Sequence, residues 1–143
     1  MATTALMYGL AYKSAFNKEI DFDSDTIKAV LCDTGYTPNQ DTHQYASSLA
    51  DECTDASYSR KTLASKAVTY DSATNKLILD CADFGWTALT ETFRYLVYVD
   101  TQTGSDSTSP LIAYVDFGAQ QTATAQDVNI TVDADGIAKV TVA

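Results

Sequence analysis

Residues 92–100, with the sequence TFRYLVYVD, constrain the possible folds of this chain more than any other segment. Apolar or aromatic side chains occupy both sets of alternating positions, which are Phe93, Tyr95, Val97 and Val99 in one set and Leu96 and Tyr98 in the other. Because successive side chains of a strand point to opposite faces of a sheet, a strand of this kind must be buried on both faces or covered by a neighbour. The rest of the chain therefore has to supply covering layers.

Other strand patterns follow one another along the chain and are separated by turn residues. The segment DSATN at 71–75 predicts the turn of a hairpin. The only helix that we expect in the body of the chain is a short one over about 42–52, capped by Asp41 or Thr42. The predicted strands are 26–32, 64–70, 76–81, 92–100, 110–117, one that contains Val128, Ile130 and Val132, and a last one that ends near Val142.

The length and the residue types agree with an all-β fold. A chain of 143 residues is long enough for one domain with its own core. The 20 threonines and nine tyrosines suit the pleated surface of a sheet, and the 16 aspartates suit turns. We therefore predict a single-domain β-sandwich or small barrel of about six to eight strands. Residues 17–143 would form it, and residues 1–16 would form an N-terminal arm.

The charge of the chain excludes several classes of partner. A formal net charge of -10 leaves no basic stripe that could neutralise phosphates, so we expect neither nucleic acid nor an anionic membrane as a partner. The apolar run over 5–12 is shorter than a signal peptide or a membrane span requires. We therefore expect synthesis in the cytoplasm, where thiols are reduced.

Residues that could carry catalysis or hold a cofactor are few and scattered. Cys32, Cys53 and Cys81 are far apart in sequence and odd in number, which disfavours disulfides and zinc. Any nucleophilic triad would have to use His43, the only histidine. No GxSxG elbow and no glycine-rich phosphate loop is present. We therefore expect no enzymatic activity and no cofactor.

The acidic string DFDSD has the alternate spacing that opens a calcium-binding EF-hand loop. It places Asp21, Asp23 and Asp25 at the first ligand positions. Thr26 and Cys32 stand where that loop needs a glycine and a bidentate glutamate, so an EF-hand is disfavoured. A looser oxygen-ligated cation at the three aspartates stays open.

Candidate residues for protein contacts come from two segments and from tyrosines outside the predicted strands. Residues 117–126, FGAQQTATAQ, carry no charge and would form a loop, either one covered by another subunit or an ordinary polar loop. Tyrosine is enriched at interfaces because it combines apolar area with a hydroxyl group. The interface candidates are Leu6, Tyr8, Leu10, Tyr12, Phe16, Tyr36, Tyr45, Tyr58, Phe117, Gln120, Gln121 and Thr122.

The order of several segments resembles a family of small virion structural proteins of tailed bacteriophages. These segments are NKEIDFDSDTIKAVLC (17–32), YTPNQDTHQY (36–45), LASKAVTYDSATNKLILD (63–80), ADFGW (82–86) and SPLIAYVDFG (109–118). Members of the family are described as head decoration (cement) proteins or as tail-fibre-like proteins.

The resemblance implies a non-enzymatic β domain on the surface of the virion capsid, present as a homo-oligomer, either a trimer or a dimer. Its partner would be the major capsid protein on the outside of the head shell. The alternative is a tail or fibre module that binds a host-surface glycan or receptor. Exposed tyrosines, the loop around His43 and Trp86 would then be the candidate platform residues.

Overall fold

Strand β6 (Phe84–Asp100) contains the segment with two apolar faces, and it lies inside a five-stranded antiparallel sheet. The computed structural model describes residues 3–142. The sheet has the order β1-β7-β6-β2-β3, so β6 is paired along both edges. Its other strands are β1 (Thr4–Met7), β2 (Ile27–Cys32), β3 (Lys61–Thr62) and β7 (Leu111–Ile130).

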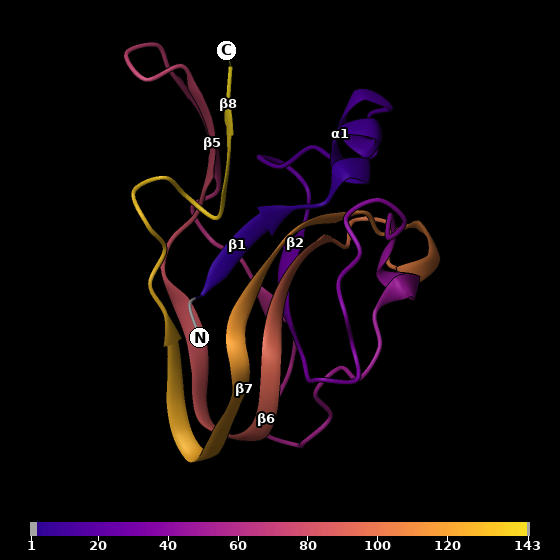
Figure 1. Ribbon diagram of the computed structural model, residues 1–143, viewed down its shortest axis with the longest axis vertical. Coiled ribbons are helices and arrows are strands. Elements are labelled where there is room, and N and C mark those ends of the chain that lie inside the picture. Colours follow the sequence, from indigo (N-terminus) through magenta and orange to yellow (C-terminus); the bar gives the residue numbers. More distant parts are fainter. Residues whose placement is uncertain (1–2, 143) are drawn as a thin grey trace.

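A second, three-stranded sheet has the order β4-β5-β8. Its strands are β4 (Ala67–Asp71), β5 (Lys76–Asp80) and β8 (Ala138–Thr141), and both pairings are antiparallel. The helix α1 (Gly9–Phe16) follows β1, and two single 3₁₀ turns lie at Ala46–Ser48 and Asp106–Thr108. Figure 1 shows β5 and β8 extending away from the larger sheet, with α1 beside them. The predicted all-β class is confirmed.

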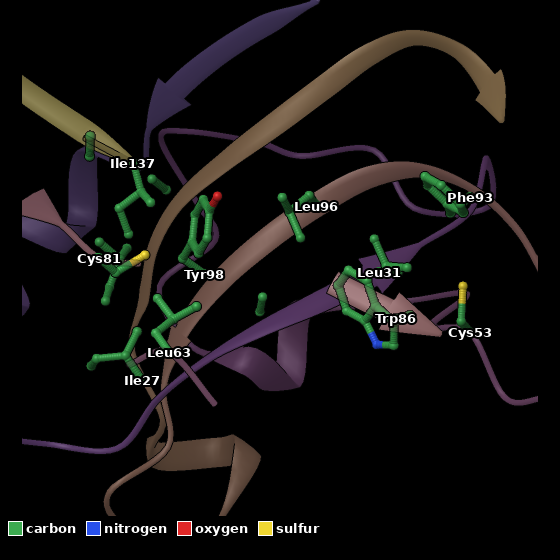
Figure 2. Close-up of a cluster of buried hydrophobic side chains, with 14 of the residues drawn as sticks. Ile27, Leu31, Cys53, Leu63, Cys81, Trp86, Phe93, Leu96, Tyr98 and Ile137 are labelled. Atoms are coloured by element: carbon green, nitrogen blue, oxygen red, sulfur yellow. The ribbon is translucent and has the colours of Figure 1, made fainter. Parts of the chain in front are cut away.

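Two buried clusters cover the two faces of the five-stranded sheet, as the pattern of residues 92–100 requires. Leu96 and Tyr98 belong to the first cluster, which lies along one face of β6 (Figure 2). Tyr95, Val97 and Val99 belong to the second, together with Tyr8 and Ala11 of the N-terminal segment. The prediction that this strand is buried on both faces is therefore confirmed.

The strands β6 and β7 form one long ribbon that bends on itself (Figure 1). Their register shifts between Trp86 and Leu89 and again between Leu89 and Glu91. In the same region Ala88 and Ala125 have positive φ angles of 51° and 48°. Such bulges bend a strand and increase its twist. Residues 84–91 and 123–130 thereby return toward the first cluster, where Trp86 and Leu89 are buried.

The prediction of a helix over 42–52 is wrong. Only the 3₁₀ turn Ala46–Ser48 forms there. The amide of Ala46 donates to the carbonyl oxygen of Ser109, and the carbonyl oxygen of Gln44 accepts from the amide of Leu111. The segment is thus held extended by pairing with the start of β7, and these long-range backbone bonds take the groups that a helix would use.

The prediction that the uncharged segment 117–126 forms a loop is also wrong. It forms the middle of β7 and pairs with β6, with Thr122 opposite Thr92 and Gln121 opposite Phe93. Threonine has a high strand propensity. The backbone N–H and C=O groups of this segment form hydrogen bonds with the partner strand β6.

Residues 3–16 also differ from the arm that the sequence predicts. Residues 4–7 pair with β7 along the edge of the larger sheet, and Tyr8 is 0% exposed beneath α1. The helix has no side-chain N-cap bond, which explains why no capping signal marks it in the sequence. None of the helices within residues 3–142 is long and apolar enough to cross a membrane.

Candidate functional site

The most distinctive surface of the molecule is an apolar face beside α1. Seven large apolar side chains are between 36% and 89% exposed within residues 3–142. They come from β1, from α1, and from the three-stranded sheet with the residue that follows it. We define the apolar face by these seven residues, which are Leu6, Tyr12, Phe16, Val68, Tyr70, Leu77 and Val142.

The register of the three-stranded sheet explains why apolar side chains gather on one side of it. Residues that lie directly opposite each other share a face of the sheet. One row across the sheet is Val68, Leu79 and Ala138, and the next row is Tyr70, Leu77 and Val140. The intervening positions carry Thr69, Asp71, Lys76, Ile78, Lys139 and Thr141, which occupy the other, more polar side.

A groove separates this apolar side from α1 and has a volume of about 220 Å³. The helix contributes Ala11, Tyr12 and Ala15 to its wall, and Phe16 lies one turn beyond Tyr12 on the same helix face. Lys139 is the one charged residue among the residues that line the groove. The helix therefore covers the sheet only in part, and a partner could complete the cover.

The seven residues of the apolar face together expose a large area. With about 150–250 Å² for a large side chain, the exposed fractions of the seven residues add up to roughly 700 Å². The largest apolar patch of a typical monomer is about 300–600 Å². One partner in a standard interface contributes about 800 Å². The summed exposure of the seven residues is therefore comparable to the area that one partner contributes to a standard interface.

Of the candidates that the sequence suggests for contacts, the structure places Leu6, Tyr12 and Phe16 on the apolar face. Leu10 lies beside them on α1 and is half-buried. The prediction of surface positions is wrong for Tyr8 and Tyr36, which are 0% and 1% exposed. Their hydroxyl groups are 2.7 Å apart in the second cluster.

Tyr45 and Tyr58 are half-buried, and their hydroxyl groups form hydrogen bonds within the molecule. The Tyr45 hydroxyl donates to Glu19. The Tyr58 hydroxyl donates to Glu52 and accepts the amide of Leu31, so it links a loop to β2. These two tyrosines lie outside the apolar face.

The remaining candidates lie on the ribbon, in its uncharged segment 117–126. Phe117 packs against Phe93 at a ring distance of 5.7 Å. Gln120, Gln121 and Thr122 are exposed, and the side-chain amide of Gln120 donates to both carboxylate oxygens of Asp33.

Two of the residues that could form a glycan platform, Trp86 and His43, make internal hydrogen bonds. Trp86 is 1% exposed, and its indole N–H donates to the carbonyl oxygen of Ser59 at 2.7 Å. The Nδ1 atom of His43 lies 3.1 Å from the hydroxyl of Tyr36 and accepts the amide of Asn39. Burial lowers the pKa of His43, which favours its neutral form. Both side chains thus serve local structure.

The three cysteines are free, buried thiols. Burial raises the pKa of Cys32 to about 12 and that of Cys81 to about 11. Burial also raises the pKa of Cys53. A thiol reacts as the thiolate, so these side chains are unreactive at neutral pH.

The acidic turn uses its carboxylates to hold its own backbone. Asp25 accepts the amide of Asp21 at 3.0 Å, and Asp21 accepts the amide of Ser24 at 3.3 Å. Asp23 is exposed. Within residues 3–142 no group of three or more histidine, cysteine, aspartate or glutamate residues is close enough to hold a metal ion.

Asp100, at the end of β6, is buried next to this turn. One of its oxygens accepts the amide of Gln102, and the other, Oδ2, has no hydrogen-bond partner within the described residues. Burial and the neighbouring carboxylate of Asp25 raise the pKa of Asp100 from 3.8 to about 7. The folded protein therefore holds a proton here that the unfolded chain releases near pH 4.

Asp100 makes the stability depend on pH with a definite sign. Between about pH 4 and pH 7 the unfolded chain binds fewer protons at this residue, so its contribution to the free energy of unfolding falls as the pH rises. We expect Asp100→Asn to gain stability relative to the parent by more than about 1 kcal/mol over this interval. Urea unfolding at a series of pH values measures the difference, and the titration of His43 cancels because both proteins contain it. A difference that does not change with pH would contradict the assignment.

The sequence reasoning missed four members of the apolar face, which are Val68, Tyr70, Leu77 and Val142. A signal was present, because the two strands of the predicted hairpin carry apolar residues at alternate positions that face each other. Comparison with protein-family models, with curated proteins and with solved structures finds no match for this chain.

Proposed function

We propose that this chain is a non-enzymatic structural protein of a tailed-bacteriophage virion that binds the major capsid protein and stabilises the head shell from outside. The observation that carries the proposal is the apolar face. On a chain with a net charge of -10, exposed apolar side chains of α1 and of the three-stranded sheet, Tyr12, Val68 and Leu77, line one groove, and Tyr70 lies on the same face of that sheet. Such a surface suits a protein that is covered in its working state. The resemblance of residues 17–130 to phage virion proteins suggests the particle.

The use of the polar side chains supports an assembly role. His43 bonds to neighbouring loop groups, and the thiols are buried. Two carboxylates, Glu52 and Asp106, hold Arg60 in ion pairs of 2.7 and 2.8 Å that tie distant loops together. In each case the reactive or charged group is engaged in internal contacts that stabilise the fold.

The two unusual surfaces lie at opposite ends of the molecule. Figure 1 shows the bend of the β6–β7 ribbon at one end and the three-stranded sheet with α1 at the other. We assign the uncharged residues 119–126 of the ribbon to contact with the shell, and the apolar face to contact between subunits. Many modest contacts, repeated by the symmetry of the shell, can then hold the protein without a deep pocket.

The position and copy number of the protein on purified virions test the proposal. We expect electron microscopy to show density on the outer head surface, in a number set by the symmetry of the shell. A few copies at the tail tip or baseplate, or saturable binding of the isolated protein to host cells, would instead support the alternative of a tail or fibre module.

A variant makes the test specific for the ribbon. Thr124→Glu adds a charge to the uncharged surface, and we expect it to reduce binding to undecorated shells at least tenfold, or about 1.4 kcal/mol. Thr62→Glu is the matched control, because Thr62 is also an exposed strand threonine but lies on β3. Equal binding by the two variants would remove the ribbon from the contact.

A further inference from the structure

We infer that a second copy of this chain pairs its β4 edge with the β4 edge of the first copy across a two-fold axis, and so engages the two residues of the apolar face that lie on β4, Val68 and Tyr70. The inference rests on the proposed function, since it specifies one subunit contact at the edge of the face assigned there to such contacts. It fixes the assembly as a dimer and specifies its register.

The first step is that β4 has an open edge. It is the outer strand of the three-stranded sheet and pairs only with β5 there. The carbonyl oxygens of Asn75 and Leu79 accept amides from the β8 side. Because the backbone groups of successive residues in an antiparallel strand point to opposite sides, Lys76 and Ile78 face β4. In turn Ala67, Thr69 and Asp71 face β5, and the amide and carbonyl groups of Val68 and Tyr70 point to the open edge.

The second step is that the edge lacks the usual protection against pairing. Native proteins block such edges with lysine, proline, bulges or inward-pointing charges. The strand reads AVTYD, and its one charged residue, Asp71, stands at the end beside the turn. Val68 and Tyr70 are 40% and 55% exposed at this edge.

The third step is the register. A two-fold axis through Thr69, the middle residue of β4, pairs the whole strand with its copy in antiparallel direction. Val68 of each copy then lies opposite Tyr70 of the other, with the outward backbone groups of both residues in hydrogen-bonding position. Aromatic residues paired with β-branched residues, and threonine paired with threonine, are favourable across strands. The axis supplies both kinds of pair.

The fourth step is that this register joins the surfaces without a clash of charge. The two sheets become one six-stranded sheet, and their apolar rows become continuous on one side. The Lys66 end of each strand meets the Asp71 end of the other, and the two Asp71 carboxylates lie at opposite ends of the pair. The contact is self-complementary, as a two-fold interface must be.

A cysteine variant of the full chain tests both the dimer and its register. In a non-hydrogen-bonded antiparallel pair the Cα atoms are about 4.5 Å apart, which is within the range of a disulfide. We expect Thr69→Cys to form a covalent dimer rapidly under mild oxidation. Val68→Cys and Tyr70→Cys are the matched controls, because each would lie diagonally from its own copy, at about 7–8 Å. Buried native thiols do not interfere.

The parent chain provides the second readout. We expect sedimentation to show a dimer at micromolar concentration. The double variant Val68→Lys and Tyr70→Lys should raise the dissociation constant at least tenfold, while Thr62→Lys, on the edge of the other sheet, should not change it. A monomer or trimer, or equal cross-linking of the three cysteine variants, would overturn the inference. Dimers in solution with no protein on the head would refute the proposed function alone, and monomers on the head would refute this inference alone.

Discussion

Replacing Trp86 by alanine is expected to lower the free energy of unfolding by about 3–5 kcal/mol, the usual cost of truncating a buried aromatic side chain to alanine. Trp86 is 1% exposed and lies between the rings of Tyr58 and Phe84, at centroid distances of 6.1 and 6.0 Å. The change also removes the hydrogen bond that the indole donates to Ser59. Because natural domains are stable by about 5–15 kcal/mol, this loss is a large part of the total.

Urea unfolding followed by far-UV circular dichroism measures the effect. Tryptophan fluorescence cannot be used, since Trp86 is the only tryptophan of the chain. Phe16→Ala is the control, because Phe16 is 89% exposed on α1 and its truncation should change the free energy by about 0.5 kcal/mol or less. A loss for Trp86→Ala as small as that expected for Phe16→Ala would show that the side of β6 that carries Trp86 is not an essential core.

Deleting residues 1–16 is expected to abolish the native fold. The deletion removes β1, which pairs along the whole of residues 113–116 of β7, and it removes Tyr8 from the second cluster. Loss of the Tyr8 ring alone costs about 3–5 kcal/mol by comparison with other buried aromatic residues. The edge of β7 and the groove side of the sheet would also become exposed, which favours aggregation.

The near-UV circular dichroism spectrum and the thermal transition of the truncated chain decide this prediction. Tyr8→Phe is the matched control, since it keeps the ring and removes only the hydroxyl that bonds Tyr36. We expect it to cost about 1 kcal/mol and to leave a cooperative transition. A truncated chain that unfolds cooperatively would return these residues to the role of a dispensable arm.

The parts of the fold that follow from the sequence are those with a strict alternating pattern. Residues 92–100 predict burial on two faces because both sets of alternating side chains are apolar, and the structure confirms it. The hairpin of β4 and β5 follows from the turn residues at 71–75. In these segments the local pattern and the final packing agree, so short-range reasoning is sufficient.

The segments that were mispredicted owe their structure to partners far away in sequence. Residues 42–52 avoid a helix because Ala46 bonds to Ser109. Residues 117–126 form a strand because β6 lies alongside them. Tyr8 is buried because its hydroxyl group bonds to that of Tyr36 and its ring packs against Tyr114. A local sequence pattern does not predict such pairings. For this reason the predicted contact residues include buried tyrosines as well as exposed ones.

The apolar face could have been predicted only in part. Val68 and Tyr70 alternate with Thr69 and Asp71, and the two leucines of the next strand alternate with Lys76 and Ile78. This pattern indicates a hairpin with one more apolar side. The sequence does not show that α1 would leave that side partly uncovered. The cover depends on where α1 lies, and α1 follows β1, which is paired with β7 far away in the sequence.

The unequal covering of the two sheets divides the molecule into a firmer and a softer part. The larger sheet is buried on both sides, whereas β4, β5 and β8 have one side only partly covered and fewer neighbours to hold them. Local opening is cheapest where few apolar contacts must be broken. The softer part is also the part that we expect a partner to bind. Association would then add stability where the free chain has least of it, and the hairpin would be protected from proteases once two copies have paired.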